Sequence, residues 1–352
     1  TVNCSLIQAQ IRFSLLINLI WSCSNQTAKL TFRLNNIYKM EHKPAYIALI
    51  VTTFIVYIVT ITFNALAASS LGWQSGIFLN TTNVVSDVFY LEITPAGWMF
   101  SVWGVIYIWQ GLWLLYGLST ICRKSDSGYL YVTPPVMPPV IYVSFILNNV
   151  FNVTWLFLWD RRLIGWALPF IGLVPVMLYI GLFFSFKRVY DYGPILIKQG
   201  LNREIWLIRM LVQNGIAFYA TWVSIAPLLN VAMVFHYSWK VPQDTSCTIV
   251  LAILLVEILA WFIMDNFIFD KYTRYTFSPF IILNLALSAS LARNWDPTKT
   301  NSIFTAVLMG LVILLTIAKL VIMIWKHIKR PIAQTYDTTY MLSYDNQGLE
   351  KN

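Results

Sequence analysis

Long apolar runs, separated by short polar segments, fill the chain from about residue 45 to residue 325. Most of these runs have about the 20 residues that an α-helix needs to cross the hydrocarbon core of a bilayer. The seventh run is short and partly polar, and it opens with Ser278 and Pro279, so a re-entrant segment is an alternative there. The pattern predicts about eight membrane-spanning helices, at residues 45–68, 96–119, 138–159, 163–186, 207–236, 247–269, 276–294 and 303–325. We therefore expect an all-α, polytopic membrane helix bundle.

The composition and the placement of charge agree with this class. Hydrophobic residues make up 58% of the chain and charged residues 11%, far from the balance of a soluble domain. Most basic residues near the spans fall on one side, namely Lys39, Lys43, Arg123, Lys124, Lys187, Arg188, Lys198, Arg203, Arg209, Lys271, Arg274, Lys326, Lys329 and Arg330. The other side has Arg161, Arg162, Lys240, Arg293 and Lys299. The positive-inside rule then predicts that both termini are cytoplasmic. The net charge of +9 thus comes from basic residues at the membrane edges, which set the orientation of the spans. We therefore expect no nucleic-acid partner.

The two ends of the chain differ from its middle. The first methionine is Met40, and residues 1–39 contain only a nine-residue apolar run. We expect translation to begin at Met40 and residues 1–39 to be a disordered or non-native upstream segment. Residues 331–352 are polar and are predicted to form a cytoplasmic tail. A glycosylation sequon at Asn80 falls in the first non-cytoplasmic loop, where the modification is allowed.

Aromatic and amide residues share one face of the fifth predicted span. At about 100° per residue, Trp222, Ala226 and Asn230 lie on one side of a helix, with Tyr219 beside them. A helix that contacts only lipid would not be expected to carry an amide on such a face. It indicates a helix that lines a pocket inside the bundle.

Two further spans carry similar faces. Trp103 and Tyr107 are one turn apart in the second span, and Asn152 and Trp155 share a face of the third. Asparagine amides within hydrocarbon need hydrogen-bond partners, so this face should point into the bundle. The alternative is that the asparagines join helices and the tryptophans only pack.

Four segments in these spans resemble signatures of the TspO/MBR family, the tryptophan-rich sensory proteins and translocator proteins. They are residues 94–107, 152–155, 162–168 and 219–230. They occur in the order of the family, and the resemblance covers about residues 45–236. One departure is the gap between Trp98 and Trp103, which is one residue shorter than the family pattern and turns Trp98 by about 100°.

The resemblance implies a five-helix bundle that binds hydrophobic ligands, notably porphyrins and sterols, in an aromatic pocket. The residues that it places around the pocket are Trp103, Tyr107, Asn152, Trp155, Tyr219, Trp222, Ala226 and Asn230. Residues 40–240 would form this TspO-like core. Residues 241–330 would add a three-helix region without a counterpart in the five-helix members.

The additional region has ionisable residues of its own: Glu257 and Asp265 in the sixth span, and Lys319 in the eighth. Acidic side chains at membrane depth usually face protein and pair with other groups. Asp265 and Lys319 both lie toward the predicted cytoplasmic half, so we predict an ion pair between them. Glu257 is deeper and has no obvious cation. Its carboxyl is either neutral and hydrogen-bonded or part of a proton or ion path.

The function expected from the sequence is binding, sensing or transport of a hydrophobic small molecule of the porphyrin or sterol class. A secondary transporter or channel that uses Glu257, Asp265 and Lys319 is one alternative, and a membrane scaffold without a ligand is another. The chain shows no nucleophile–His–acid set, phosphate loop or metal-ligand spacing, so we expect no enzyme activity, metal or cofactor. A homodimer is left open.

Overall fold

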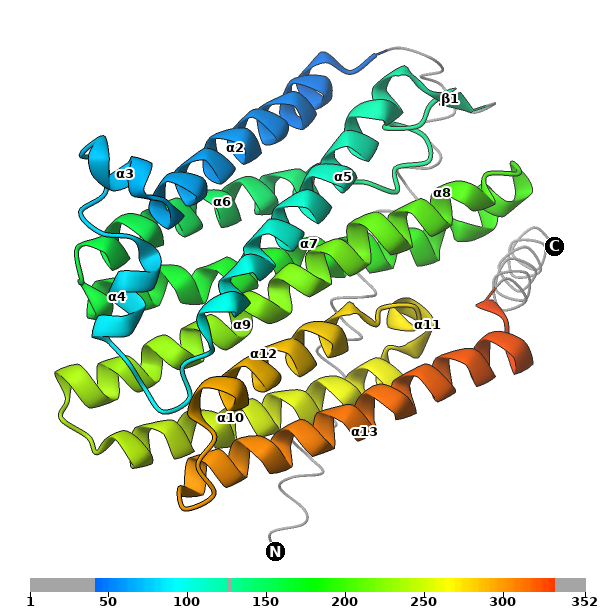
Figure 1. The fold of residues 1–352 in the computed structure, drawn as a ribbon. Coiled ribbons are helices and arrows are strands. Elements are labelled where there is room, and N and C mark those ends of the chain that lie inside the picture. Colours follow the sequence, from blue (N-terminus) through cyan, green and yellow to red (C-terminus); the bar gives the residue numbers. More distant parts are fainter. Residues whose placement is uncertain (1–41, 126–127, 333–352) are drawn as a thin grey trace, which may run out of the picture.

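The computed structural model describes residues 42–125 and 128–332, so the expectations for residues 1–39 and for most of the tail lie outside the described residues. The described chain is almost entirely helical (Figure 1). Its elements are α2 (Pro44–Ala68), α3 (Ser70–Gln74), α4 (Thr82–Val88), the 3-10 helix η1 (Gly97–Ser101), α5 (Val102–Cys122), β1 (Lys124–Ser125), β2 (Gly128–Tyr129), α6 (Pro139–Asp160), α7 (Ile164–Lys198), α8 (Asn202–Leu207), the π-helix η2 (Ile208–Gln213), α9 (Asn214–Met233), the π-helix η3 (Val234–Ser238), α10 (Gln243–Ile263), the π-helix η4 (Met264–Ile268), α11 (Asp270–Thr273), α12 (Ser278–Asn294) and α13 (Thr300–Lys329). Strands β1 and β2 form one antiparallel pair.

Seven continuous helices in the described part are long and apolar enough to cross a membrane. They are Pro44–Ala68, Gly97–Cys122, Pro139–Asp160, Ile164–Lys198, Asn202–Ser238, Gln243–Ile268 and Thr300–Lys329. Each overlaps a predicted span, and the protein is a polytopic all-α membrane bundle. Pro44 and Pro139 stand in the first turn of α2 and α6, where the missing N–H has no helical partner to lose.

The predicted span at 276–294 is helix α12, which has 17 residues. At 1.5 Å per residue it is about 25 Å long, less than the thickness of a bilayer core. Its start is anchored inside the bundle, where Ser278 donates to the backbone oxygen of Asn214 at 2.7 Å, well within the continuous helix Asn202–Ser238. Its other end lies beside the loop before η1, where Asn294 donates to the backbone oxygen of Thr94 at 2.8 Å. A re-entrant segment would return to the end from which it came. Burial against α9 and α13 compensates for the short length of α12.

Five helices close a ring. Neighbouring contacts connect α2 to α6, α6 to α7, α7 to α9, α9 to α5, and α5 back to α2. These are the helices of the predicted five-helix core, and the ring is the upper part of the bundle in Figure 1. Side chains of α5 and α6 meet inside it, with the rings of Trp113 and Phe145 5.0 Å apart.

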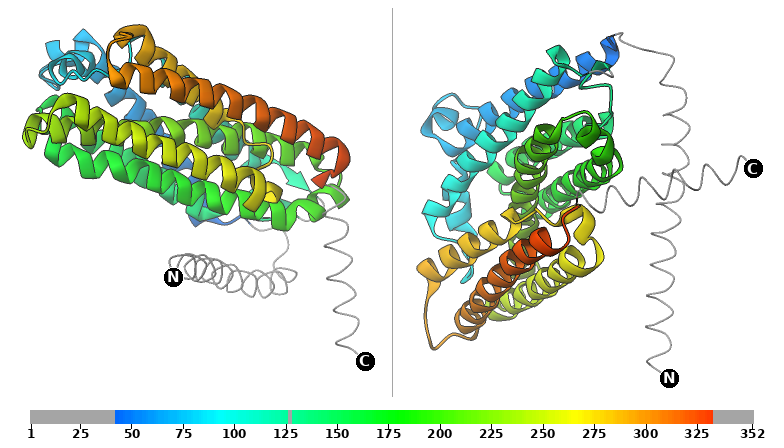
Figure 2. Two further views of the ribbon diagram at one scale, coloured as in Figure 1. Left: turned by 90° about the horizontal axis from the view of Figure 1, so that it is seen from below. Right: turned by 90° about the vertical axis from the view of Figure 1, so that its right-hand side faces the viewer.

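Helices α10, α12 and α13 form a second ring that shares α9. Helices α10 and α12 both pack on α9, and α13 packs on both of them. The views in Figure 2 show this group lying against one side of the five-helix ring. Helix α9 is therefore a common wall with a different neighbour on each side.

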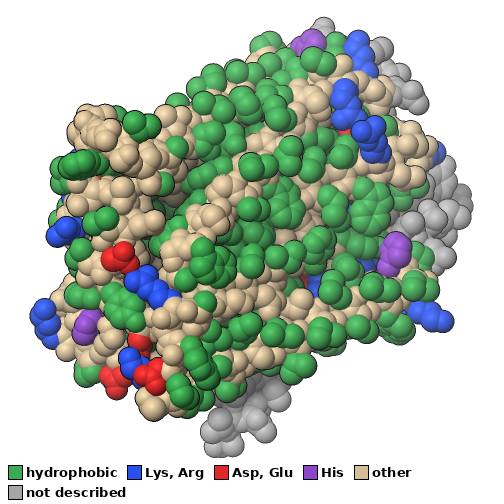
Figure 3. Space-filling view, in the orientation of Figure 1, with side chains coloured by type: hydrophobic (Ala, Val, Ile, Leu, Met, Phe, Trp, Pro, Cys, Tyr) green, Lys and Arg blue, Asp and Glu red, His purple; other side chains and the backbone are tan. Residues whose placement is uncertain are grey.

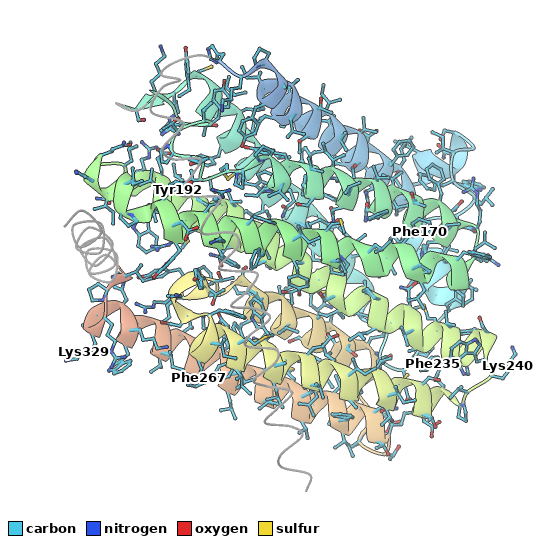
Figure 4. All side chains as sticks on the ribbon, turned by 180° about the vertical axis from the view of Figure 1, so that it is seen from behind. Phe170, Tyr192, Phe235, Lys240, Phe267 and Lys329 are labelled. Atoms are coloured by element: carbon cyan, nitrogen blue, oxygen red, sulfur yellow. The ribbon has the colours of Figure 1, made fainter. Side chains whose placement is uncertain are left out.

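Charge separates the two ends of the bundle from its apolar middle (Figure 3). We call the end where α2 begins and α13 ends the basic end. Figure 4 places Lys329 and Tyr192 there, and Lys240 and Phe235 at the opposite end. Both ends of the described chain thus lie at the same end of the bundle, as expected if the termini share a compartment.

At the opposite end, the segment between α2 and η1 is held down by buried polar contacts. The carboxylate of Asp160 accepts the backbone N–H groups of Leu79 at 2.9 Å and Asn80 at 2.8 Å. Arg161 lies 2.9 Å from the same carboxylate. Asn80, the sequon residue, is half-buried in this loop.

Candidate functional site

Four of the predicted pocket residues form an aromatic cluster between α5 and α9. Trp103 and Tyr107 stack with ring centroids 5.5 Å apart. Trp103 also meets Tyr219 at 5.9 Å and Trp222 at 6.2 Å, both edge to face. Trp222 is 6% exposed and Tyr219 is 2% exposed, so these side chains face the interior and not lipid.

Two predicted residues lie on α6, across the five-helix ring. Asn152 is fully buried, and its side-chain oxygen accepts a hydrogen bond from Asn64 of α2 at 2.8 Å. Trp155 is buried one turn later and stacks on Trp159 with centroids 5.5 Å apart. Asn152 therefore links two helices, and its Nδ2 group still has no partner among the described residues.

The last two predicted residues continue the α9 face. The Nδ2 group of Asn230 donates to the backbone oxygen of Ala226 at 3.0 Å. Asn230 is buried and Ala226 is half-buried. Trp98, in contrast, lies in the 3-10 helix η1 and is 52% exposed, so it does not belong to the buried cluster.

Buried polar atoms without a partner gather at these residues. Five of the eight carry one that finds no hydrogen bond within residues 42–125 and 128–332: Tyr107 Oη, Asn152 Nδ2, Trp155 Nε1, Trp222 Nε1 and Asn230 Oδ1. Buried polar groups are normally paired, so each such atom needs a water molecule, a ligand or another explanation. The site offers aromatic faces for stacking, four donor groups and one amide oxygen.

An aromatic chain covers the ring at its opposite end. Phe89, from the loop before η1, lies 6.2 Å from Trp159 of α6 and 5.1 Å from Tyr237 of η3. The hydroxyl of Tyr237 donates to the backbone oxygen of Tyr90 at 2.8 Å. These contacts connect α6, the loop before η1 and η3 at that end of the ring.

Comparison with protein families gives a match to the TSPO-like proteins over residues 49–320. The chain belongs to this family. Comparison with curated proteins and with solved structures gives no match. The matched range includes α10, α12 and most of α13, so membership in the TSPO-like family is not limited to the five-helix ring.

The additional helices of this TSPO-like protein contain the ion pair that the sequence predicted. Lys319 Nζ lies 2.6 Å from Asp265 Oδ2, and the two side chains are 2% and 0% exposed. Beside it, Asp270 binds Arg274 at 2.6 Å and Lys326 at 3.1 Å. The contacts of Asp265 and Asp270 with lysines of α13 connect η4 and α11 to that helix.

Glu257 does not join this network. It precedes Asp265 by about two helical turns, its side chain is exposed, and no ion pair to it occurs among the described residues. It instead lines an open cavity of about 410 Å³ between α7, α9, α10 and α12, which we call the lateral groove. The groove is lined by Tyr179, Leu182, Ala217, Thr221, Ser224, Ile225, Leu254, Glu257, Ile258, Ala260, Trp261, Met264, Pro279 and Leu283.

The lateral groove lies on the side of α9 that faces away from the aromatic cluster. Ser224 follows Trp222 by two residues, which places the two side chains about 160° apart around the helix. Sequence reasoning missed the groove because its polar residues come from three distant segments. It also missed Asn64, although a single asparagine inside the apolar first span was a visible signal.

Proposed function

We propose that this TSPO-like protein binds a flat hydrophobic ligand of the tetrapyrrole or sterol class inside the five-helix ring. The observation that carries the proposal is that five of the eight predicted residues, among them Tyr107 and Trp222 of the aromatic cluster, have a buried polar atom without a partner among the described residues. A flat ligand would stack on the face of Trp103 and meet the edge of Trp222, because the two rings are nearly perpendicular. Acceptors on its rim would take the N–H of Trp222 and the hydroxyl of Tyr107. Sensing and transport both begin with such a binding step.

Tyr107→Phe tests the proposal because it removes only the unpaired hydroxyl. In the full chain reconstituted in nanodiscs, we expect this variant to bind protoporphyrin IX about 3- to 10-fold more weakly, the value of one lost hydrogen bond. The ligand-free variant should be as stable as the wild type or more so, since an unsatisfied buried group is gone. Affinity is measured by porphyrin absorbance and intrinsic fluorescence, with cholesterol as competitor, and stability by thermal unfolding.

Tyr57→Phe is the matched control. The Tyr57 hydroxyl donates to the backbone oxygen of Tyr107 at 2.7 Å, so its loss should lower the unfolding temperature and leave porphyrin affinity nearly unchanged. The proposal is wrong if neither porphyrin nor cholesterol binds saturably, or if both variants change affinity equally.

A further inference from the structure

The lateral groove has the size and walls of a small-molecule site that is separate from the aromatic cluster. Its volume of about 410 Å³ falls within the range of roughly 300–1,000 Å³ that is usual for ligand pockets. Most of its walls are apolar side chains from four helices. Tyr179 on its rim is 40% exposed, so the groove opens sideways, toward the lipid that surrounds the bundle.

A carboxyl without a cation stands in this apolar groove. Glu257 is near the middle of the helical stretch Gln243–Ile268, which places it at the depth of the hydrocarbon core. Lys319, the lysine within the α13 span, is already bound to Asp265 of η4. A carboxylate in this position is costly unless a positive charge or a hydrogen-bond donor reaches it.

Aromatic rings flank the same carboxyl. Trp261 lies one helical turn after Glu257, and Tyr179 faces the groove from α7, where its hydroxyl lies 3.0 Å from Ser224 Oγ. Aromatic faces attract cations, most strongly where water is absent. The Trp261 N–H is buried and has no partner among the described residues, so it is free to donate to an oxygen on a ligand.

We propose that the lateral groove binds an amphipathic amine from the bilayer. The ammonium would pair with Glu257 between the rings of Tyr179 and Trp261, and the apolar body would lie along the walls formed by α9, α10 and α12. Charge complementarity selects this class, because an anionic amphiphile would meet the carboxylate with a like charge and a neutral one would leave it unpaired.

Photolabelling of the full chain in phosphatidylcholine nanodiscs tests this site. The probe is a twelve-carbon alkylamine with a diazirine in its chain, compared with the alcohol and the carboxylic acid of the same skeleton. We expect the amine to label the peptide that contains Tyr179 saturably, in competition with unlabelled dodecylamine. Half-saturation should need about tenfold less amine than alcohol, and the acid should not saturate.

Glu257→Gln should raise the half-saturation of the amine to that of the alcohol and leave the alcohol unchanged. Glu92→Gln makes the same change outside the groove, near the start of α13, and should leave amine labelling as in the wild type. Labelling is read at the Tyr179 peptide because the diazirine can react with Glu257 itself. Thermal unfolding verifies that each variant is folded.

Equal half-saturation for Glu257→Gln and the wild type, or amine labelling spread over all lipid-facing helices, overturns the proposal. Tyr107→Phe separates it from the proposed function, since that variant should lose porphyrin affinity and keep amine labelling of the groove. If the wild type lacks saturable porphyrin binding but shows amine labelling of the groove, the proposed function fails alone. If it binds porphyrin but lacks saturable amine labelling, the lateral-groove proposal fails alone.

Discussion

Asp265 and Lys319 bury opposite charges in a single contact between η4 and α13. A buried pair of this kind adds little stability compared with apolar residues, because both charges have lost their water. Removal of one partner is different, since it leaves the other charge buried and alone. We therefore expect the pair to specify which helix faces meet more than to stabilise the fold.

Replacement of Asp265 by Asn should destabilise the protein by about 3–5 kcal/mol, because it strands the Lys319 ammonium. The double exchange Asp265→Lys with Lys319→Asp should restore most of the loss. Folded yield and thermal unfolding in detergent measure both effects.

The exposed pair of Asp87 and Arg293 provides the comparison. Its carboxylate side chain is 63% exposed, so Asp87→Asn should cost at most about 1 kcal/mol. If the double exchange Asp265→Lys with Lys319→Asp is no more stable than Asp265→Asn, the loss of the Asp265–Lys319 contact is not the cause of the destabilisation.

At the scale of helices, the sequence predicted most of the arrangement because one helix-length apolar run marks each span. Boundaries agreed within a few residues, except that α7 continues beyond residue 186 to Lys198. There the apolar run ends but the helix does not, and Lys187 binds Asp191 one turn later at 3.1 Å. Hydropathy indicates where a helix leaves the hydrocarbon core of the membrane, and the helix can continue beyond that point.

The candidate sites were less predictable than the helices. Periodicity found the face of Trp222 and Asn230 because those residues share one helix. It could not find the lateral groove, which needs Tyr179, Ser224 and Trp261 from three different helices. It also gave no sign that Asp160 would bind the backbone of the loop before η1, since a carboxylate at a helix end ordinarily faces water.

Helix α12 depends on one side chain of α9 at its start. Asn214 Nδ2 donates to the backbone oxygen of Tyr275 at 2.8 Å, and its Oδ1 accepts the N–H of Phe277 at 3.0 Å and of Ser278 at 3.2 Å. This amide ties the first turn of the short helix to the shared wall.

Asn214→Ala should therefore lower stability by about 2–4 kcal/mol, because it breaks several buried hydrogen bonds at once. Hydrogen exchange should increase at residues 275–280, before it does so in α13. Asn202→Ala, at an exposed position of α8, should change neither quantity. Uniform exchange across all helices would instead indicate global loosening.

At the scale of the whole molecule, each end of the bundle collects its own set of loops and charges (Figure 3). The basic end carries β1, β2 and α11, and the opposite end carries α3, α4 and the turn before α13. We predict that the basic end faces the cytoplasm, because it holds most of the basic residues.

Labelling with a membrane-impermeant maleimide checks this orientation. Cys122 is exposed at the basic end, and Trp73, which is 60% exposed, lies at the opposite end. In a Cys4→Ser, Cys23→Ser background, Trp73→Cys should react in sealed vesicles that keep the cytoplasmic face inside. Cys122 should react only after permeabilisation. The reverse pattern would invert the topology.

Because helix α9 is a wall of both rings, we expect ligand binding in one ring to affect the other. A ligand that shifts or rotates α9 in one site would change the shape of the site on the other side of the helix. Thermodynamic reciprocity then requires that each guest alter the affinity of the second by the same factor. A porphyrin-like ligand and an amine from the lipid phase would thus change each other's affinity through helix α9, without direct contact between the two ligands.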